Sequence, residues 1–202
     1  MTEKIFEKYG IGIDEVGRGA IAGPVVAVAV LISSDEKQVT SLGINDSKLL
    51  TTKQRELVNQ RLLDMSTVGL LKYGVGVVGP DKIDNDGIIA STNEAMRLAL
   101  NHLDFKDKMI LVDGIINPFK DQELKVQTII KGDGKCYNIG AASIIAKVFR
   151  DKLMDQLSKD DLTWYNWKRN KGYGTAEHIK AIESYGFSQH HRKSFCKNFI
   201  YV

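Results

Sequence analysis

Four acidic residues stand at positions where strands are expected, and acidic side chains in such places can bind metal ions. Asp14 and Glu15 lie within the apolar stretch IGIDEVG, where a buried charge is costly without a cationic partner. Asp113 closes the apolar run MILVD, and Asp133 follows the next strand-like segment in KGDG. Carboxylates gathered at one sheet edge repel one another unless divalent cations lie between them, and such oxygen ligands suit Mg²⁺ or Mn²⁺. Two such ions serve phosphoryl transfer, because one activates water and the other stabilises the leaving oxygen.

The same acidic residues can also be ordinary charges beside strands. The chain has 25 Asp and Glu residues, so some fall next to strands by chance. Neighbouring residues of a strand point to opposite faces, so Asp14 and Glu15 share a site only if the strand bends or ends there. Gly17 and Gly19 allow such a bend. The spacing alone therefore leaves both interpretations open.

Strands and helices must bring these residues together. Apolar patterns predict strands at IGIDEVG, VVAVAVLI, VGLLKYGVGVVG, MILVD and LKVQTII. Helical spacing predicts helices from 51 or 52 to 65, and at 88–103, 141–157 and 175–186. This order fits an α/β fold in which helices flank a mixed sheet, with a helical C-terminal portion at about 155–202. We expect residues 1–202 to form a single domain.

Composition restricts the class of protein without identifying it. No run approaches the roughly 20 apolar residues that span a bilayer, and the N-terminus lacks a secretion signal. We therefore expect a cytoplasmic protein that does not associate with a membrane. Cys136 and Cys196 have no metal-ligand spacing, and we expect them to be reduced. A net charge of +3 permits a nucleic-acid partner. Basic and aromatic residues alternate in WKRNKGYG and HHRKSFCK, and residues 190–193 predict either a basic patch or a solvated face.

Seven motifs, in order along nearly the whole chain, resemble the ribonuclease HII family. They are GIDEVGRGAIAGPVV at 12–26, NDSK at 45–48, ILVDG at 110–114, KGD at 131–133, AASIIAKVFRD at 141–151, KGYGT at 171–175 and HHRKSF at 190–195. The resemblance implies a ribonuclease H-like α/β fold with a helical C-terminal extension. It also implies an endonuclease that hydrolyses the RNA strand of RNA/DNA hybrids, nicks duplex DNA 5′ of embedded ribonucleotides, and leaves 5′-phosphate and 3′-hydroxyl ends.

The resemblance also assigns the metal site and its partners. Asp14, Glu15, Asp113 and Asp133 match the four catalytic, metal-binding carboxylates of the family, with Mn²⁺ or Mg²⁺ as cofactor. The partners are RNA/DNA hybrid and ribonucleotide-containing duplex DNA. We expect a monomer, and a contact with a replication clamp stays open. Asp151 is expected to be structural, and ion pairing or a solvated face is the first explanation of Lys147, Arg150 and Asp151.

Six residues are candidates for substrate binding. The resemblance matches Gly17, Arg18 and Gly19 to a GRG loop, and Tyr173 to a tyrosine that reads an RNA-to-DNA junction. Glycine backbone can approach a 2′-hydroxyl closely, although a tight turn also explains the glycines. Tyr173 can stack on a sugar or base, or simply pack. Ser47 and Lys48 offer a hydroxyl and a charge to a phosphate, unless this segment only caps a helix.

Two other families are less consistent with the sequence. GVGVVG at 74–79 is a literal G-x-G-x-x-G, but Pro80 follows at once and the glycines lie in an apolar strand, unlike a dinucleotide-binding turn. Ribonuclease HIII would require a longer N-terminal domain and another pattern in place of GRG. The chain departs from the ribonuclease HII pattern at Gly87 and Asn170, where asparagine and histidine are usual, and the first change could loosen substrate contacts.

Overall fold

A mixed sheet of five strands organises the fold. The computed structural model describes residues 4–44, 47, 49–158 and 163–197. The strands are β1 (Ile11–Val16), β2 (Val25–Ile32), β3 (Leu71–Val78), β4 (Met109–Asp113) and β5 (Lys125–Ile129), in the order β3-β2-β1-β4-β5. β1 pairs antiparallel with β2, as does β2 with β3, whereas β1–β4 and β4–β5 are parallel. The predicted mixed sheet is therefore confirmed.

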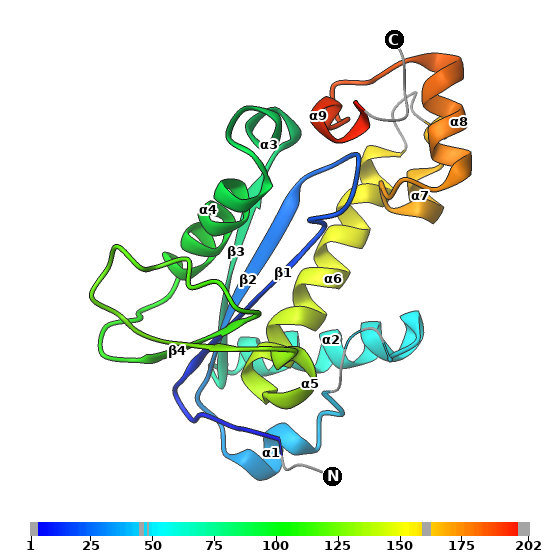
Figure 1. Cartoon of the computed structure of the whole chain (residues 1–202). Coiled ribbons are helices and arrows are strands. Elements are labelled where there is room, and N and C mark those ends of the chain that lie inside the picture. Colours follow the sequence, from blue (N-terminus) through cyan, green and yellow to red (C-terminus); the bar gives the residue numbers. More distant parts are fainter. Residues whose placement is uncertain (1–3, 45–46, 48, 159–162, 198–202) are drawn as a thin grey trace.

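Helices cover both faces of this sheet (Figure 1). The helices described are α1 (Glu36–Thr40), α2 (Thr52–Thr67), α3 (Pro80–Asp86), α4 (Ile88–Leu100), α5 (Gly132–Lys135), α6 (Tyr137–Leu157), α7 (Trp167–Asn170), α8 (Ala176–Tyr185) and α9 (Lys193–Cys196), with a short 3₁₀ helix at Thr163–Tyr165. One face packs on α4 through Ile11, Ile13 and Ala27. The other packs on α2 and α6 through Val28 and Val30. Both faces of β2 are therefore buried, which explains its unbroken apolar sequence.

Glycines allow two helices to lie unusually close to the sheet. A Cβ atom at Gly76 would lie 1.9 Å from the carbonyl oxygen of Ala95 on α4, and one at Gly74 would lie 2.2 Å from that of Ala99. On the other face, a Cβ at Gly12 would lie 2.1 Å from the backbone of Asn138 on α6. Gly74 and Gly76 of GVGVVG therefore serve helix packing rather than dinucleotide binding, and Gly79 precedes the short helix α3.

The C-terminal helices gather at one end of the molecule, beside the end of α6 (Figure 1). They form a small core of their own, in which Trp167, Tyr165 and Ile182 pack against Met154 of α6 and Ile21 of the loop after β1. This confirms a helical C-terminal portion among the described residues up to 197. The packing brings two chain segments, one after β1 and one near the C-terminus, into direct contact.

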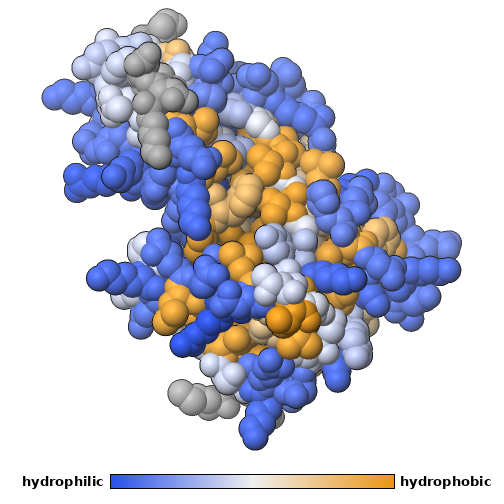
Figure 2. Space-filling view, turned by 180° about the vertical axis from the view of Figure 1, so that it is seen from behind, coloured by the Kyte–Doolittle hydropathy of each residue, from blue (hydrophilic) through white to orange (hydrophobic). Residues whose placement is uncertain are grey.

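The surface combines exposed charges with scattered apolar side chains. Figure 2 shows apolar side chains near the middle of the side that faces away in Figure 1, within a largely hydrophilic surface. At the sheet edge, β3 leaves Tyr73 and Val77 partly exposed. Among the described residues, none of the helices combines the length and apolar content needed to cross a membrane.

Candidate active site

Three carboxylates meet where β1 and β4 end. The parallel pairing puts Ile13 beside Val112, so Asp14 and Asp113 follow in adjacent positions at the carboxyl edge of the sheet. Asp14, Glu15 and Asp113 line a depression of about 270 Å³ on the side of α6. The wall of this α6-side depression also includes Val16, Ser47, Arg55, Ser143, Lys147 and Tyr173. Topology alone therefore brings together acids that lie about 100 residues apart in the chain.

Asp14 is the most buried of the three acids, with 5% of its surface exposed. One of its oxygens, Oδ1, accepts a hydrogen bond from the backbone N–H of Glu15 at 2.7 Å. Burial raises the pKa of Asp14 well above its ordinary value, and the charges of Glu15 and Asp113 raise it further, against a hydrogen bond from Ser143. A divalent cation would relieve this repulsion, so the electrostatics of the site fit a bound metal.

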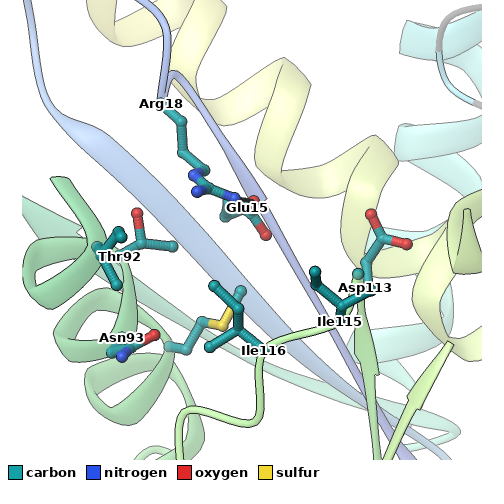
Figure 3. Close-up of a pocket in the computed structure, with 10 residues that line it drawn as sticks. Glu15, Arg18, Thr92, Asn93, Asp113, Ile115 and Ile116 are labelled. Atoms are coloured by element: carbon teal, nitrogen blue, oxygen red, sulfur yellow. Dashed lines mark hydrogen bonds and ion pairs between the residues drawn. The ribbon is translucent and has the colours of Figure 1, made fainter. Parts of the chain in front are cut away.

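Glu15 also lines a second depression of about 280 Å³, on the side of α4. Figure 3 shows Arg18 extending toward Glu15, with Thr92 and Asn93 of α4 on one side and Ile115, Ile116 and Asp113 on the other. Glu15 Oε1 accepts a hydrogen bond from Arg18 Nη1 at 3.2 Å. Burial raises the pKa of Glu15, whereas the Arg18 cation lowers it and Asp113 raises it. Arg18 is thus the expected cationic partner for Glu15.

Asp113 joins the two depressions, because it lines both of them together with Glu15. Asp14 therefore lines only the α6-side depression, whereas Glu15 lines both, and the charge of Asp113 acts on both acids of β1. Asp113 Oδ1 accepts a hydrogen bond from the N–H of Gly132 at 2.6 Å, which ties the end of β4 to α5.

Asp133 lies one residue beyond this tie, on α5, and is buried. Its Oδ1 accepts a hydrogen bond from the N–H of Gly134 at 2.9 Å. Within the described part of the chain, Asp133 lines neither depression, and no group of three or more Asp, Glu, His or Cys side chains is arranged to hold one ion. The structure therefore brings three of the expected ligands together and the fourth beside them.

The GRG segment forms a turn in which its two glycines have different surroundings. Gly17 is buried with φ +90°, and a Cβ there would lie 2.2 Å from Arg150 Nε. Gly19 is exposed, and a Cβ there would meet nothing within 4 Å. Gly17 is thus required by the turn itself. The backbone at Gly19 stays open to an approaching ligand.

The other substrate-binding candidates differ in exposure. Tyr173 is 37% exposed, lines the α6-side depression and has its ring centroid 5.6 Å from the Arg150 guanidinium. Ser47 is buried, and its Oγ lies 3.0 Å from Ser143 Oγ while it borders the same depression. The expectation for Lys48 lies outside the described residues.

Several residues of the site were not predicted from the sequence. Ser143 and Lys147 lie four residues apart on α6 and so face the depression together, a spacing that could have identified them.

Lys147 forms the expected ion pair with Asp151 at 2.6 Å. The expectation of a solvated or ion-paired Arg150 is wrong, because its side chain is fully buried against backbone carbonyls. Both expectations for residues 190–193, a basic patch and a solvated face, are wrong for His191 and Arg192, because these side chains are buried.

The comparisons with known proteins agree with this geometry. The family model of ribonuclease HII matches residues 11–198. The chain belongs to the ribonuclease HII family. It is 43% identical over 189 residues to "Ribonuclease HII" of Acetivibrio thermocellus, covering 94% of this chain and 70% of that protein. It is 44% identical over 186 residues to "Ribonuclease HII" of Rickettsia bellii, covering 92% of this chain and 89% of that protein.

Solved structures support the same assignment. The crystal structure of ribonuclease H2 from Pyrococcus horikoshii has a TM-score of 0.70 and 31% identity, covering 91% of this chain and 92% of that one. Ribonuclease HII from Archaeoglobus fulgidus, solved in complex with PCNA, has a TM-score of 0.73 and 25% identity, covering 91% and 93%. As a member of the family, the chain is an endoribonuclease that hydrolyses the RNA strand of RNA/DNA hybrids and leaves 5′-phosphate ends.

Proposed function

We propose that this ribonuclease also nicks duplex DNA 5′ of embedded ribonucleotides, with Asp14, Glu15, Asp113 and Asp133 as its catalytic carboxylates. The observation that carries the proposal is the meeting of three of these acids at the ends of β1 and β4, in a depression that Tyr173 also lines. A site that joins acidic ligands to an exposed aromatic ring can take a phosphodiester and the sugar beside it together.

The cofactor is proposed to be Mg²⁺ or Mn²⁺, held by these carboxylates. An all-oxygen donor set suits either ion, and the burial and mutual repulsion that raise the pKa of Asp14 favour a cation between the acids. Bound ions of this kind supply an activated water and neutralise charge on the departing 3′ oxygen. Asp14 and Asp113 would hold them from adjacent strands, Glu15 from the α4 side, and Asp133 from α5.

The remaining candidates bind and orient the substrate. The exposed backbone of Gly19 would approach the 2′-hydroxyl, and Gly17 would supply the turn that presents it. Arg18 is half exposed and paired with Glu15, so it can contact a phosphate while holding that acid in place. The ring of Tyr173 would stack on the sugar or base at the RNA-to-DNA junction. Ser47 is proposed to contact a phosphate on the α6 side, and Lys48, which lies outside the described residues, is likewise proposed to bind a phosphate.

A protein partner of the enzyme stays a prediction. The A. fulgidus relative is bound to PCNA in its crystal structure. A binding assay with a purified replication clamp would test whether this chain makes a comparable contact. The monomeric state, the single domain and the cytoplasmic location likewise stay predictions.

Cleavage of two matched duplexes tests the proposed function. One is DNA with a single ribonucleotide, the other an RNA/DNA hybrid of the same sequence, each with Mg²⁺, Mn²⁺ or EDTA. We expect both to be cut with either metal, the first on the 5′ side of its ribonucleotide, and neither with EDTA. Asp14→Asn and Asp113→Asn should abolish cleavage and retain hybrid binding, whereas the exposed Asp104→Asn control should keep both. Metal-dependent cleavage by both site variants would refute the assignment.

A further inference from the structure

Arg150 is fully buried on α6 and binds main-chain carbonyls of two separate segments. Its Nε donates to Pro24 O at 2.9 Å and its Nη2 to Ala22 O at 3.1 Å. Its Nη1 donates to Lys171 O at 2.8 Å. We call residues 17–24 the recognition loop and residues 171–174 the tyrosine turn. A single guanidinium therefore holds the recognition loop and the tyrosine turn together.

Arg192 is a second fully buried arginine, and it holds the recognition loop near both ends. Its Nε donates to Gly23 O at 2.9 Å, and its Nη1 donates to Arg18 O at 3.0 Å. Its backbone N–H donates to Ile21 O at 2.8 Å. The carbonyls of Arg18, Ile21, Ala22, Gly23 and Pro24 therefore all accept hydrogen bonds from the two arginines, while Arg18 also lines the α4-side depression.

The recognition loop and the tyrosine turn also touch directly. The N–H groups of Ile21 and Ala22 both donate to Gly172 O, at 2.9 and 3.0 Å. Gly172 has φ +81°, and a Cβ there would lie 2.4 Å from Ala22 O. The next residue is Tyr173, whose ring lies over the Arg150 guanidinium. A change in the arginines would therefore move the tyrosine relative to the loop.

Burying two cations costs free energy of desolvation, so packing alone does not explain the two arginines. The hydrogen bonds found for the two guanidiniums among the described residues all go to carbonyls rather than carboxylates, and Arg192 Nη2 has no partner there. Apolar side chains of similar volume often stabilise such a position at least as well. A guanidinium, however, fixes several acceptors in one plane with a defined geometry, which neither an apolar side chain nor a lysine can do.

We propose that Arg150 and Arg192 are positioning residues that set the distance between the backbone of Gly19 and the ring of Tyr173. This distance decides how well the enzyme accepts a single ribonucleotide joined to DNA, while the carboxylates at the ends of β1 and β4 perform the cleavage. The inference rests on the proposed function of these two segments. It assigns the arginines a role in substrate selectivity without contact with the substrate.

Lysine variants of the full-length enzyme test this proposal. Arg150→Lys and Arg192→Lys keep the charge and lose the planar set of donors, and Arg97→Lys is the control. Arg97 also holds a loop through a carbonyl, Pro118 O, and through Asp121, but on α4 away from the recognition loop. Circular dichroism establishes that each variant is folded. Hydrogen exchange of the Ile21 and Ala22 amides then reports the position of the loop, and kcat and KM are measured on both duplexes with Mn²⁺.

In Arg150→Lys and Arg192→Lys we expect the two amides to exchange about tenfold faster, and kcat/KM on the single-ribonucleotide duplex to fall about tenfold to a hundredfold. Cleavage of the hybrid should stay within about threefold of the wild type, and Arg97→Lys should change neither readout. Unchanged exchange, or an equal loss on both substrates, overturns the proposal. Failure of both variants to fold overturns it too, since the pair would then be required for folding. A wild type that exchanges as expected but does not cut the single-ribonucleotide duplex refutes the proposed function instead.

Discussion

Replacing Asp14 with asparagine should stabilise the metal-free protein while it abolishes cleavage. Asp14 is almost wholly buried, and burial followed by the charges of Glu15 and Asp113 raises its pKa well above the ordinary 3.8. Asparagine has the same shape and keeps an oxygen for the N–H of Glu15, but it carries no charge. The substitution therefore removes the unfavourable electrostatic energy and leaves the packing intact.

The size of the effect follows from the burial. A buried group without full compensation costs about 1 to 3 kcal/mol, so we expect the free energy of unfolding to rise by about 2 kcal/mol at neutral pH. For a chain of this length that corresponds to an increase of about 4 to 8 °C in Tm. The acid is protonated in both states below pH 3.8, so wild type and variant should then be equally stable. As the pH rises, the unfolded state releases its proton first, so the wild type loses stability relative to the variant.

Thermal unfolding followed by circular dichroism in EDTA, at about pH 5 and about pH 8, measures this difference. Asp104→Asn removes an exposed acid and should leave Tm unchanged. Adding Mn²⁺ should reverse the order, because a ligand at a hundredfold excess over its Kd stabilises the wild type by about 2.7 kcal/mol and the variant much less. If Asp14→Asn melts below the wild type in EDTA at both pH values, the electrostatic reasoning is refuted.

Four further substitutions have defined outcomes. Tyr173→Ala should lower cleavage at a single ribonucleotide about tenfold more than cleavage of a hybrid, in parallel kinetic assays, because it removes a stacking surface. Gly17→Ala should cost about 1 to 3 kcal/mol in urea unfolding, since φ is +90° and its Cβ would collide with Arg150. Trp167→Phe removes the indole N–H that His178 Nε2 accepts at 2.9 Å, and should cost about 1 kcal/mol in the same assay. Burial lowers the pKa of His191 to about 4, so the unfolded state takes up a proton first and stability falls as the pH drops from 6.5 toward 4. His191→Gln should flatten that slope in acid titrations; an equal slope would contradict this interpretation.

The strands could be predicted because their apolar side chains indicate which strands are buried. The run VVAVAVLI is apolar at every position, and β2 is covered by helices on both faces. Asp113 could be placed at a sheet edge because it ends an apolar strand, and parallel pairing with β1 then sets it beside Asp14. Local sequence patterns were therefore sufficient to predict the strands whose burial depends on their own side chains.

The boundaries and the buried cations could not be predicted in this way. Helix α6 begins at Tyr137 rather than 141, although it includes Asn138 and Gly140, which are poor helix formers. The Asn138 amide donates to Glu7 O and Gly10 O, and Gly140 packs closely against Asp133 O, so tertiary contacts override propensity. The burial of Arg150, for which ion pairing or a solvated face is the expectation, could not be predicted, because its partners are backbone carbonyls that residue identities do not reveal.

The close fit between β3 and α4 governs the shape of the α4-side depression. Thr92, Asn93 and Met96 form one wall of the space in front of Glu15, and they belong to the helix that rests on Gly74 and Gly76. An added methyl group at either glycine would push the helix outward or tilt it, and the wall would move with it. Gly74 and Gly76, which line neither depression, thus set the width of the entrance to the acids, and substitutions there should change how well the substrate fits.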